Sequence, residues 1–295
     1  MGAADAVPGV SGGTIALITG IYDRLIGAFT SADPALVRRV LAALVGDRGD
    51  LRVVFRELDG AFLLALGAGI ATAILTVTRV LHVGLESFPV LTYGFFFGLI
   101  AASAVVLRDE LRLDTAARAV AGVAGVVVAF VASGSASAAL GESVVATAAA
   151  GAIAVSAMIL PGISGSLLLV ILGQYERMTS ALSAFVDALL ALATGGPVST
   201  VLDTGVPVVA FIAGGVVGLL TVAHTVRAAL AARREATLAF LVGLVVGALR
   251  APVVRVGEEV PAWTTAVLGE FAVAAVVGAL VVLGVERAAG GIDID

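Results

Sequence analysis

One motif rich in helix-breaking residues occurs twice in this sequence. It reads PGVSG from Pro8 and PGISG from Pro161, and each copy is followed by glycine, any residue, tyrosine, an acid and arginine, from Gly20 and from Gly173. The offset is 153 residues in both places (161 − 8 and 173 − 20). Glycine-rich loops that lead into helices present unpaired N–H groups to anions such as phosphate. The duplication therefore predicts two anion-binding loops.

The residue types in both copies suit a phosphate group. Glycine lets the backbone approach the ligand, proline interrupts a helix, hydroxyls donate hydrogen bonds, and arginine can pair with two phosphate oxygens at once. Two other interpretations stay open, namely glycines that serve close helix packing and arginines that extend to the membrane interface. The predicted substrate-binding set is Pro8, Gly9, Ser11, Gly12, Gly13, Thr14 and Arg24 in the first copy, and Pro161, Gly162, Ser164, Gly165, Ser166 and Arg177 in the second.

Carboxylates near the motifs are candidates for coupling transport to an ion. They are Asp5, Asp23 and Glu176. Asp5 would repel a phosphate unless it were protonated or paired, so we expect it to be an arginine partner or a proton carrier. The second half has Met158 at the matching position, which makes a twofold role for Asp5 doubtful. The motif tyrosines, Tyr22 and Tyr175, are predicted to be interfacial aromatics.

The composition is that of a membrane protein. Hydrophobic residues make up 60% of the chain and charged residues 13%, and the mean hydropathy is +1.13. Apolar runs of about 20 residues, enough to span a bilayer as helix, recur along the sequence. Cysteine is absent and there are two histidines, which leaves little equipment for acid–base or zinc chemistry. We therefore expect neither an enzyme nor a resident cofactor, and the lack of a basic block argues against nucleic acid as a partner.

Arginine placement predicts the path of the chain through the membrane. The predicted spans are 61–81, 88–107, 116–133, 206–226, 236–254 and 264–284. Segment 31–60 carries five arginines and is predicted to be cytoplasmic, with an amphipathic surface helix at 34–45. Later loops keep the correct sidedness, except the one at 251–263, only if 144–178 is a re-entrant hairpin that returns to its own side. Irregular backbone at membrane depth requires cover by protein or a cavity.

The repeat extends into the spans. With an offset of 145 residues, Gly69 matches Gly214 and Gly98 matches Gly243. Each half is then one hairpin and three spans, and an odd number of spans places the halves in opposite orientations. The predicted fold is an all-α polytopic integral membrane protein with an inverted-topology repeat. The first repeat covers 1–143 with its hairpin at 1–29, and the second covers 144–295. The leading arm of the first hairpin would lie before Met1, so we expect either an asymmetric hairpin or a start codon assigned too late.

A family resemblance adds to this interpretation. The stretch that carries it is GAADAVPGVSGGTIALITGIYDRLI, with its weaker echo in the second half. It resembles the PopT-type undecaprenyl-phosphate translocases, and the likeness covers essentially the whole chain. The resemblance implies a multi-pass flippase of the cytoplasmic (plasma) membrane that recycles a polyprenyl-phosphate carrier for cell-envelope glycan synthesis. It implies undecaprenyl phosphate as the lipid, or a dolichyl-type phosphate if the source is an archaeon.

Two other classes of function remain open. A secondary transporter of a small anion or ion would share the inverted hairpins but would need a water-filled vestibule. An intramembrane enzyme such as a lipid phosphatase is disfavoured by the scarcity of histidine. No nucleotide-binding loop of the Walker type is present, so we expect proton or sodium coupling if transport is uphill. The oligomeric state is left open.

Overall fold

The computed structural model describes residues 1–12, 15–16, 19–21, 24, 55, 59–141, 143–158 and 164–290. Within these ranges every regular element is a helix and there is no strand, as the sequence predicted. The amphipathic helix expected at 34–45 lies outside the described residues, and so do Gly13, Thr14, Tyr22, Asp23, Pro161 and Gly162.

Six helices in the described part of the chain are long and apolar enough to cross a membrane. They are Gly60–Ser87, Pro89–Val106, Ala116–Ser133, Val198–Leu219, Ala228–Glu259 and Thr265–Ala288. Each overlaps one of the six predicted spans. The chain is therefore a multi-pass membrane protein, with about 20 apolar residues available for each crossing.

From α6 onward the elements follow one another with short connections. In chain order they are α1 (Gly2–Ala6), α6 (Gly60–Ser87), α7 (Pro89–Val106), the 3₁₀ turn η1 (Leu107–Glu110), α8 (Ala116–Leu140), α9 (Val144–Ala157), α10 (Gly165–Ile171), α11 (Tyr175–Ala193), α12 (Val198–Ala248), α13 (Arg250–Glu259) and α14 (Thr265–Gly290).

Some predicted loops are helical instead. The segment 227–235 was expected to connect two spans, but it continues α12, with non-helical dihedrals only at Arg233 (φ −148°, ψ 62°). It consists of alanine, leucine, arginine and glutamate, which are strong helix formers, and it has no glycine or proline to end the helix. The chain therefore bends at Arg233. By contrast, α6 ends before Pro89, because the residue that precedes a proline disfavours helix.

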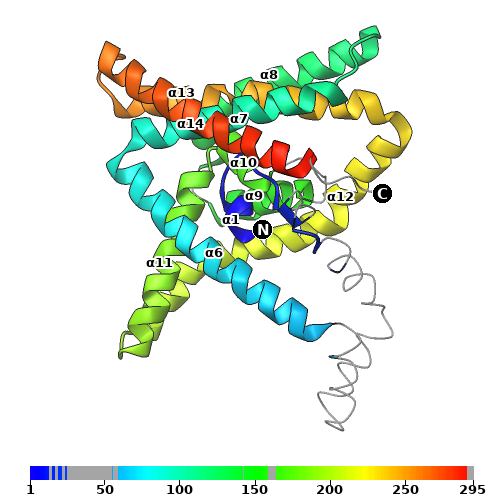
Figure 1. Cartoon of the computed structure of the whole chain (residues 1–295). Helices are drawn as coiled ribbons and strands as arrows, with labels where there is room; N and C mark the ends of the chain where they lie inside the picture. The colour runs from blue at the N-terminus through cyan, green and yellow to red at the C-terminus, as the bar shows by residue number, and fades with distance from the viewer. Residues whose placement is uncertain are drawn as a thin grey trace.

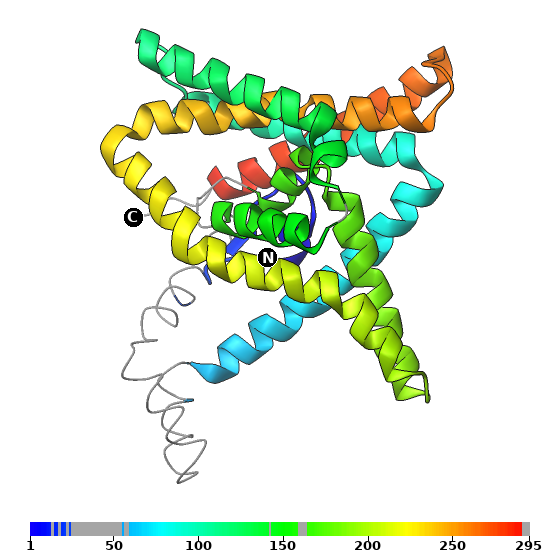
Figure 2. The ribbon, with the colours of Figure 1, turned by 180° about the vertical axis from the view of Figure 1, so that it is seen from behind.

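Three short helices occupy the centre of the molecule. Figures 1 and 2 show α1, α9 and α10 surrounded by long helices, with α7, α8, α14 and the second part of α12 on one side and α6, α11 and the first part of α12 on the other. The three have 5, 14 and 7 residues. None has the length of about 20 residues that spans a bilayer. They contain or flank the two copies of the duplicated motif.

Two close helix crossings have the same construction. A side chain at Gly278 of α14 would overlap the carbonyl oxygen of Phe95 in α7, and one at Gly125 of α8 would overlap that of Phe240 in α12. The positions correspond at the offsets of the repeat, since 278 − 125 is 153 and 240 − 95 is 145. In each crossing a helix of one half packs on a helix of the other. An internal repeat would produce this equivalence. The inverted repeat itself stays a prediction.

Contacts between distant loops agree with the predicted sidedness. Three polar contacts join residues in or next to loops that the predicted topology places on the same face of the membrane: 108–115 with 227–235, 82–87 with 179–205, and 134–143 with 251–263. The contacts are the ion pair of Arg118 with Glu235, the pair of Arg79 with Asp187 (2.6 Å), and the bond from Arg250 to the carbonyl oxygen of Phe130 (2.6 Å).

The two ends of segment 144–178 also lie together. Nη1 of Arg177 donates a hydrogen bond of 3.4 Å to the carbonyl oxygen of Gly141. Between these ends α9 packs against α10. The chain therefore doubles back on itself, as a hairpin must, and its re-entry into the membrane stays a prediction.

Candidate functional site

The first motif is held against helix α7. Helix α1 ends at Ala6 and Val7 is extended, because the proline that follows cannot continue a helix without removing a hydrogen bond. Pro8 itself is fully buried. The hydroxyl of Ser103 lies 2.7 Å from the carbonyl oxygen of Gly9 and can donate to it. A polar side chain on a membrane-spanning helix thus satisfies a carbonyl of the loop.

Asp5 turns back onto the motif. Its Oδ1 accepts a hydrogen bond of 3.0 Å from the backbone N–H of Gly12. The carboxylate lies so close to Gly12 that any side chain there would overlap it. In the second half, Met158 lies against Gly165 at the matching positions, since 158 − 5 and 165 − 12 are both 153. An apolar thioether therefore takes the place of the acid, and the two motifs differ chemically.

The second motif carries a buried pair of hydroxyls. Ser164 precedes the first residue of α10 and Ser166 lies in its first turn. Their Oγ atoms are 2.7 Å apart, and both side chains are buried. When one hydroxyl donates to the other, the acceptor keeps its own hydrogen for a third group. The pair can therefore donate to an anion.

The glycines that follow each motif share a left-handed backbone conformation, and Gly173 ends a helix. Gly20 and Gly173 have φ values of +68° and +64°, in the left-handed region where a side chain is strained. After α10, the N–H groups of Gly173 and Gln174 bond back to the carbonyls of Val170 (3.0 Å) and Leu169 (2.8 Å). This is the hydrogen-bond pattern of a glycine-terminated helix. This part of the motif therefore has a structural role in both halves.

The two motif arginines lie at the ends of the hairpins. The guanidinium of Arg24 pairs with the carboxylate of Asp59, with Nη2 3.0 Å from Oδ1, and lies over the ring of Phe62 at 4.3 Å. The hydrogen bond from Arg24 holds the pKa of Asp59 below its usual range, so this exposed pair stays ionised at neutral pH. Arg177 contacts Gly141, as described above, and the side-chain oxygen of Gln174 at 3.4 Å.

The prediction that Tyr175 is an interfacial aromatic was wrong. Its side chain is buried, and its hydroxyl donates a hydrogen bond of 2.7 Å to the carbonyl oxygen of Ala6. Its ring packs edge-on against Phe96. Tyr175 thus ties the second motif to the end of α1. Next to it, Glu176 accepts a hydrogen bond of 3.3 Å from the hydroxyl of Tyr93.

A cavity of about 340 Å³ lies where the two halves meet, and we call it the central cavity. Its lining comes from α1, α6, α9, α10, α11 and α12 and includes Asp5, Met158, Gly165, Ser166, Tyr175 and Met178. The structure therefore brings Asp5 of the first half together with Ser166 of the second. The remaining lining is almost wholly apolar.

Ser11 lies elsewhere. With Gly9 and Val10 it lines a separate cavity of about 70 Å³, which is also bounded by Ser103 and Glu286. The two motifs thus open into different cavities rather than into one shared site. No group of three or more histidines and carboxylates that could hold a metal ion occurs among the residues whose placement the structure gives.

Comparison with protein families matches residues 1–272 to the family described as VCA0040-like, undecaprenyl phosphate translocase-like. The match covers most of the 295 residues. The chain belongs to this family. It is also 35% identical, over 271 residues, to a protein of Vibrio cholerae serotype O1 named polyprenyl-phosphate transporter. That alignment covers 92% of this chain and 79% of the relative. No solved structure matches.

The sequence did not predict the roles of two residues that shape the site. Ser103 and Tyr175 both hold the backbone near the first motif through a single hydroxyl. A serine inside an apolar span was a usable signal, because polar groups in membrane helices usually bond to protein. The role of Tyr175 had no sequence signal, because its acceptor is 169 residues away.

Proposed function

We propose that this protein carries a polyprenyl phosphate across the cytoplasmic membrane, as a flippase that returns the carrier lipid for cell-envelope glycan synthesis. Membership of the translocase-like family and the name of the Vibrio relative support this proposal. The observation that carries it is the duplicated motif at the centre of a six-span bundle, next to a largely apolar cavity. Undecaprenyl phosphate or a dolichyl-type phosphate is the proposed substrate.

The phosphate head is the part of the lipid that needs a protein. Its tail can remain in the hydrocarbon, whereas a charge near the middle of the bilayer is strongly unfavourable. We place the head at the two PGxSG loops of an inverted, re-entrant repeat, with hydrogen bonds from Ser11 on one side and from Ser164 and Ser166 on the other. Because Ser11 and Ser166 line different cavities, the phosphate passes from one loop to the other rather than occupying both at once.

Asp5 is the proposed proton carrier. It is the carboxylate in the lining of the central cavity, and a phosphate beside it would be repelled while it is ionised. Protonation removes that repulsion, so a proton would enter with the lipid. Asp23, which lies outside the described residues, and Glu176 are the other candidates, and sodium coupling is the alternative.

Lipid-phosphate exchange in proteoliposomes tests the proposal. A short fluorescent polyprenyl phosphate is placed in both leaflets, and an impermeant phosphatase is added outside. If the protein is a flippase, the inner pool becomes accessible and the protected fraction falls toward zero. If the inner pool stays protected while a small anion such as inorganic phosphate crosses, the protein is a small-anion transporter instead.

A further inference from the structure

The lining of the central cavity has a polar end, and the remainder is apolar except for the hydroxyls of Thr78 and Thr179. Asp5, Ser166 and Tyr175 gather where α1 meets α10 and α11, and Ser166 and Tyr175 are buried. The apolar part comes mainly from α6, α9, α11 and α12. It includes Leu182, Val208 and Phe211. A molecule that fills this cavity must therefore be largely hydrocarbon, with a polar group at one end.

The apolar part of the cavity reaches the outer surface of the helix bundle. Ile212, which lines it, is 59% exposed, whereas Ser166 at the polar end is 6% exposed. Neighbouring side chains on the exposed face of α12 are aliphatic, such as Val209 and Val216. This face belongs to a membrane span and so meets lipid. A chain whose head lies at Ser166 can continue into the bilayer between these helices.

Both internal methionines of the protein line this cavity. The sequence has three methionines, and apart from Met1 they are Met158 and Met178. Methionine is unbranched and polarizable, so it adapts to irregular apolar shapes. Two such side chains in one cavity suit a flexible, branched hydrocarbon better than a rigid ligand.

We propose that the central cavity binds the isoprenyl units next to the phosphate of the transported lipid. This inference rests on the proposed function and assigns the part of the substrate that selects a polyprenyl chain. A volume of about 340 Å³ lies at the lower end of ordinary ligand pockets, about 300–1,000 Å³, so only the first few units fit and the rest of the tail stays in lipid. Since lipid is as apolar as the cavity, selection depends on the shape of the branched chain.

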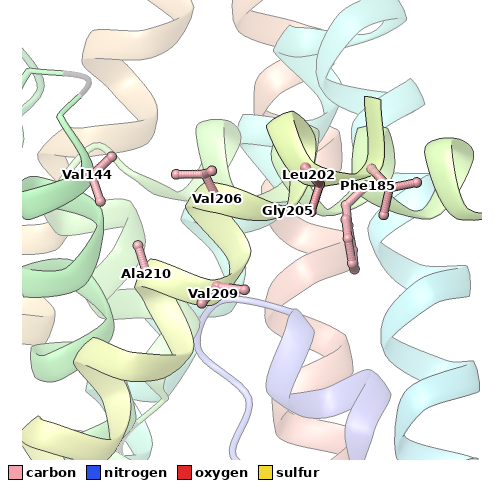
Figure 3. A pocket seen from close by; sticks show the side chains of 8 residues that line it. Val144, Phe185, Leu202, Gly205, Val206, Val209 and Ala210 are labelled. Carbon is pink, nitrogen blue, oxygen red and sulfur yellow. The ribbon is translucent and has the colours of Figure 1, made fainter. Parts of the chain in front are cut away.

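An apolar groove elsewhere on the molecule lacks the polar end that the central cavity has. It holds about 450 Å³ between the first turn of α9, α11 and α12, and Figure 3 shows its lining of Val144, Phe185 and neighbouring aliphatic residues of α12. No charged or hydroxyl side chain lines it. Ordinary membrane lipid tails suit such a surface. Because Val208 lines the central cavity and Val209 lines the groove, adjacent residues of one helix separate the two sites.

Tryptophan substitution at these adjacent positions tests the proposal. Val208→Trp fills the central cavity. We expect exchange of the fluorescent polyprenyl phosphate to slow by about tenfold or more, because a lipid chain displaced from the cavity no longer holds the phosphate in the position that transport requires. Val209→Trp fills the groove of Figure 3 and should stay within about twofold of the wild type, since a surface substitution away from the site changes little. Wild-type exchange in Val208→Trp, or equal loss in both variants, overturns the assignment.

A competition measurement keeps the result independent of folding. In wild-type proteoliposomes, farnesyl phosphate should inhibit exchange far better than decyl phosphate or inorganic phosphate. In Val208→Trp the advantage of farnesyl over decyl phosphate should disappear, whereas inhibition by inorganic phosphate should remain. Equal inhibition by the farnesyl and decyl compounds in the wild type overturns the cavity assignment while the flippase proposal stands. Failure of the wild type to exchange the fluorescent lipid at all is the separate failure of the proposed function.

Discussion

At the scale of single residues, the two copies of the motif have the same backbone design but different chemistry. Gly20 and Gly173 share a left-handed conformation, and Gly12 and Gly165 each leave room for the residue seven positions earlier. That residue is an acid in one copy and a methionine in the other. At this matched position an ionisable side chain therefore occurs in one copy alone, which suits the proposed role of Asp5 as a carrier of a single proton.

Substitution of Asp5 separates a structural role from proton transfer. In Asp5→Asn the side-chain oxygen can still accept the Gly12 N–H, so we expect less than about 1 kcal/mol of destabilisation, against about 1.5–3 kcal/mol for Asp5→Ala. If Asp5 carries the proton, Asp5→Asn nevertheless loses the stimulation of lipid exchange by a pH gradient. Thermal unfolding in detergent and exchange with and without the gradient measure the two effects. Retained stimulation in Asp5→Asn would leave Asp5 with a structural role only.

The pair of Arg24 with Asp59 allows a similar separation. If Arg24 binds phosphate during transport, Arg24→Ala slows exchange by about tenfold or more, whereas Asp59→Ala removes only its resting partner and leaves exchange near the wild-type rate. If the pair serves to anchor the hairpin, both variants lose the same activity. The pair itself is exposed to solvent, so we expect neither variant to change the thermal stability measurably. Rates of exchange for the two purified variants decide between these roles.

At the scale of helices, small residues determine which elements meet. The crossing of α7 with α14 leaves no room for a side chain at Gly98, and the crossing of α8 with α12 leaves none at Gly243. Lipid is as apolar as the helices, so close backbone approach and packing drive their association. Gly69 matches Gly214 in the sequence, yet Gly69 has no neighbour within 4 Å, whereas Gly214 contacts the backbone of Ala148. Matched glycines thus do not always have matched environments.

Leucine substitution at these glycines should reveal the difference. We expect Gly98→Leu and Gly243→Leu to lower stability by about 3 kcal/mol or more each, because the added side chain overlaps backbone that cannot move aside. Gly69→Leu and Gly284→Leu, where the space is open, should be neutral or slightly stabilising, since leucine favours helix over glycine. Thermal unfolding of the four variants in one detergent provides the comparison. Similar losses in all four would mean that the crossings are not the close contacts described.

At the scale of the whole molecule, the decisive prediction is that the second hairpin returns to its own side of the membrane. Labelling can test this directly, because the protein has no cysteine of its own. We predict that Thr194→Cys and Ala262→Cys react with an impermeant maleimide from outside the cell, whereas Leu113→Cys and Ala231→Cys react only after permeabilisation. All four side chains are exposed. The reason is that the predicted topology places 179–205 and 251–263 outside and 108–115 and 227–235 inside. The ion pair of Arg118 with Glu235 agrees with the second of these pairings.

A single crossing by 144–178 gives a different labelling pattern. Thr194 would then share a face with Leu113, and Ala231 would lie opposite. That result would remove the re-entrant hairpin and with it the inverted repeat. A denatured sample is the control, because every introduced cysteine must react in it. A variant that fails to react even there is not counted.

Much of this architecture follows from local sequence. Apolar runs of about 20 residues determine the number of spans, because each span must satisfy its own backbone hydrogen bonds in lipid. Helix ends at Pro8 and Pro89, and the reversal at Gly173, follow from dihedral limits of single residues. The offsets of 153 and 145 residues identified which positions correspond, and the equivalent crossings at Gly125 and Gly278 agree with them.

Only the tertiary structure shows what those residues touch. The bond from Tyr175 to Ala6 and the approach of Asp5 to the cavity of Ser166 join segments about half the chain apart, and composition or spacing carries no information about such pairs. Arg24 is another example. Its sequence context suits a phosphate ligand, and only the structure shows that its guanidinium pairs with Asp59. Periodicity and helix-breaking residues encode local conformation, whereas contact between distant segments depends on how all the helices pack together.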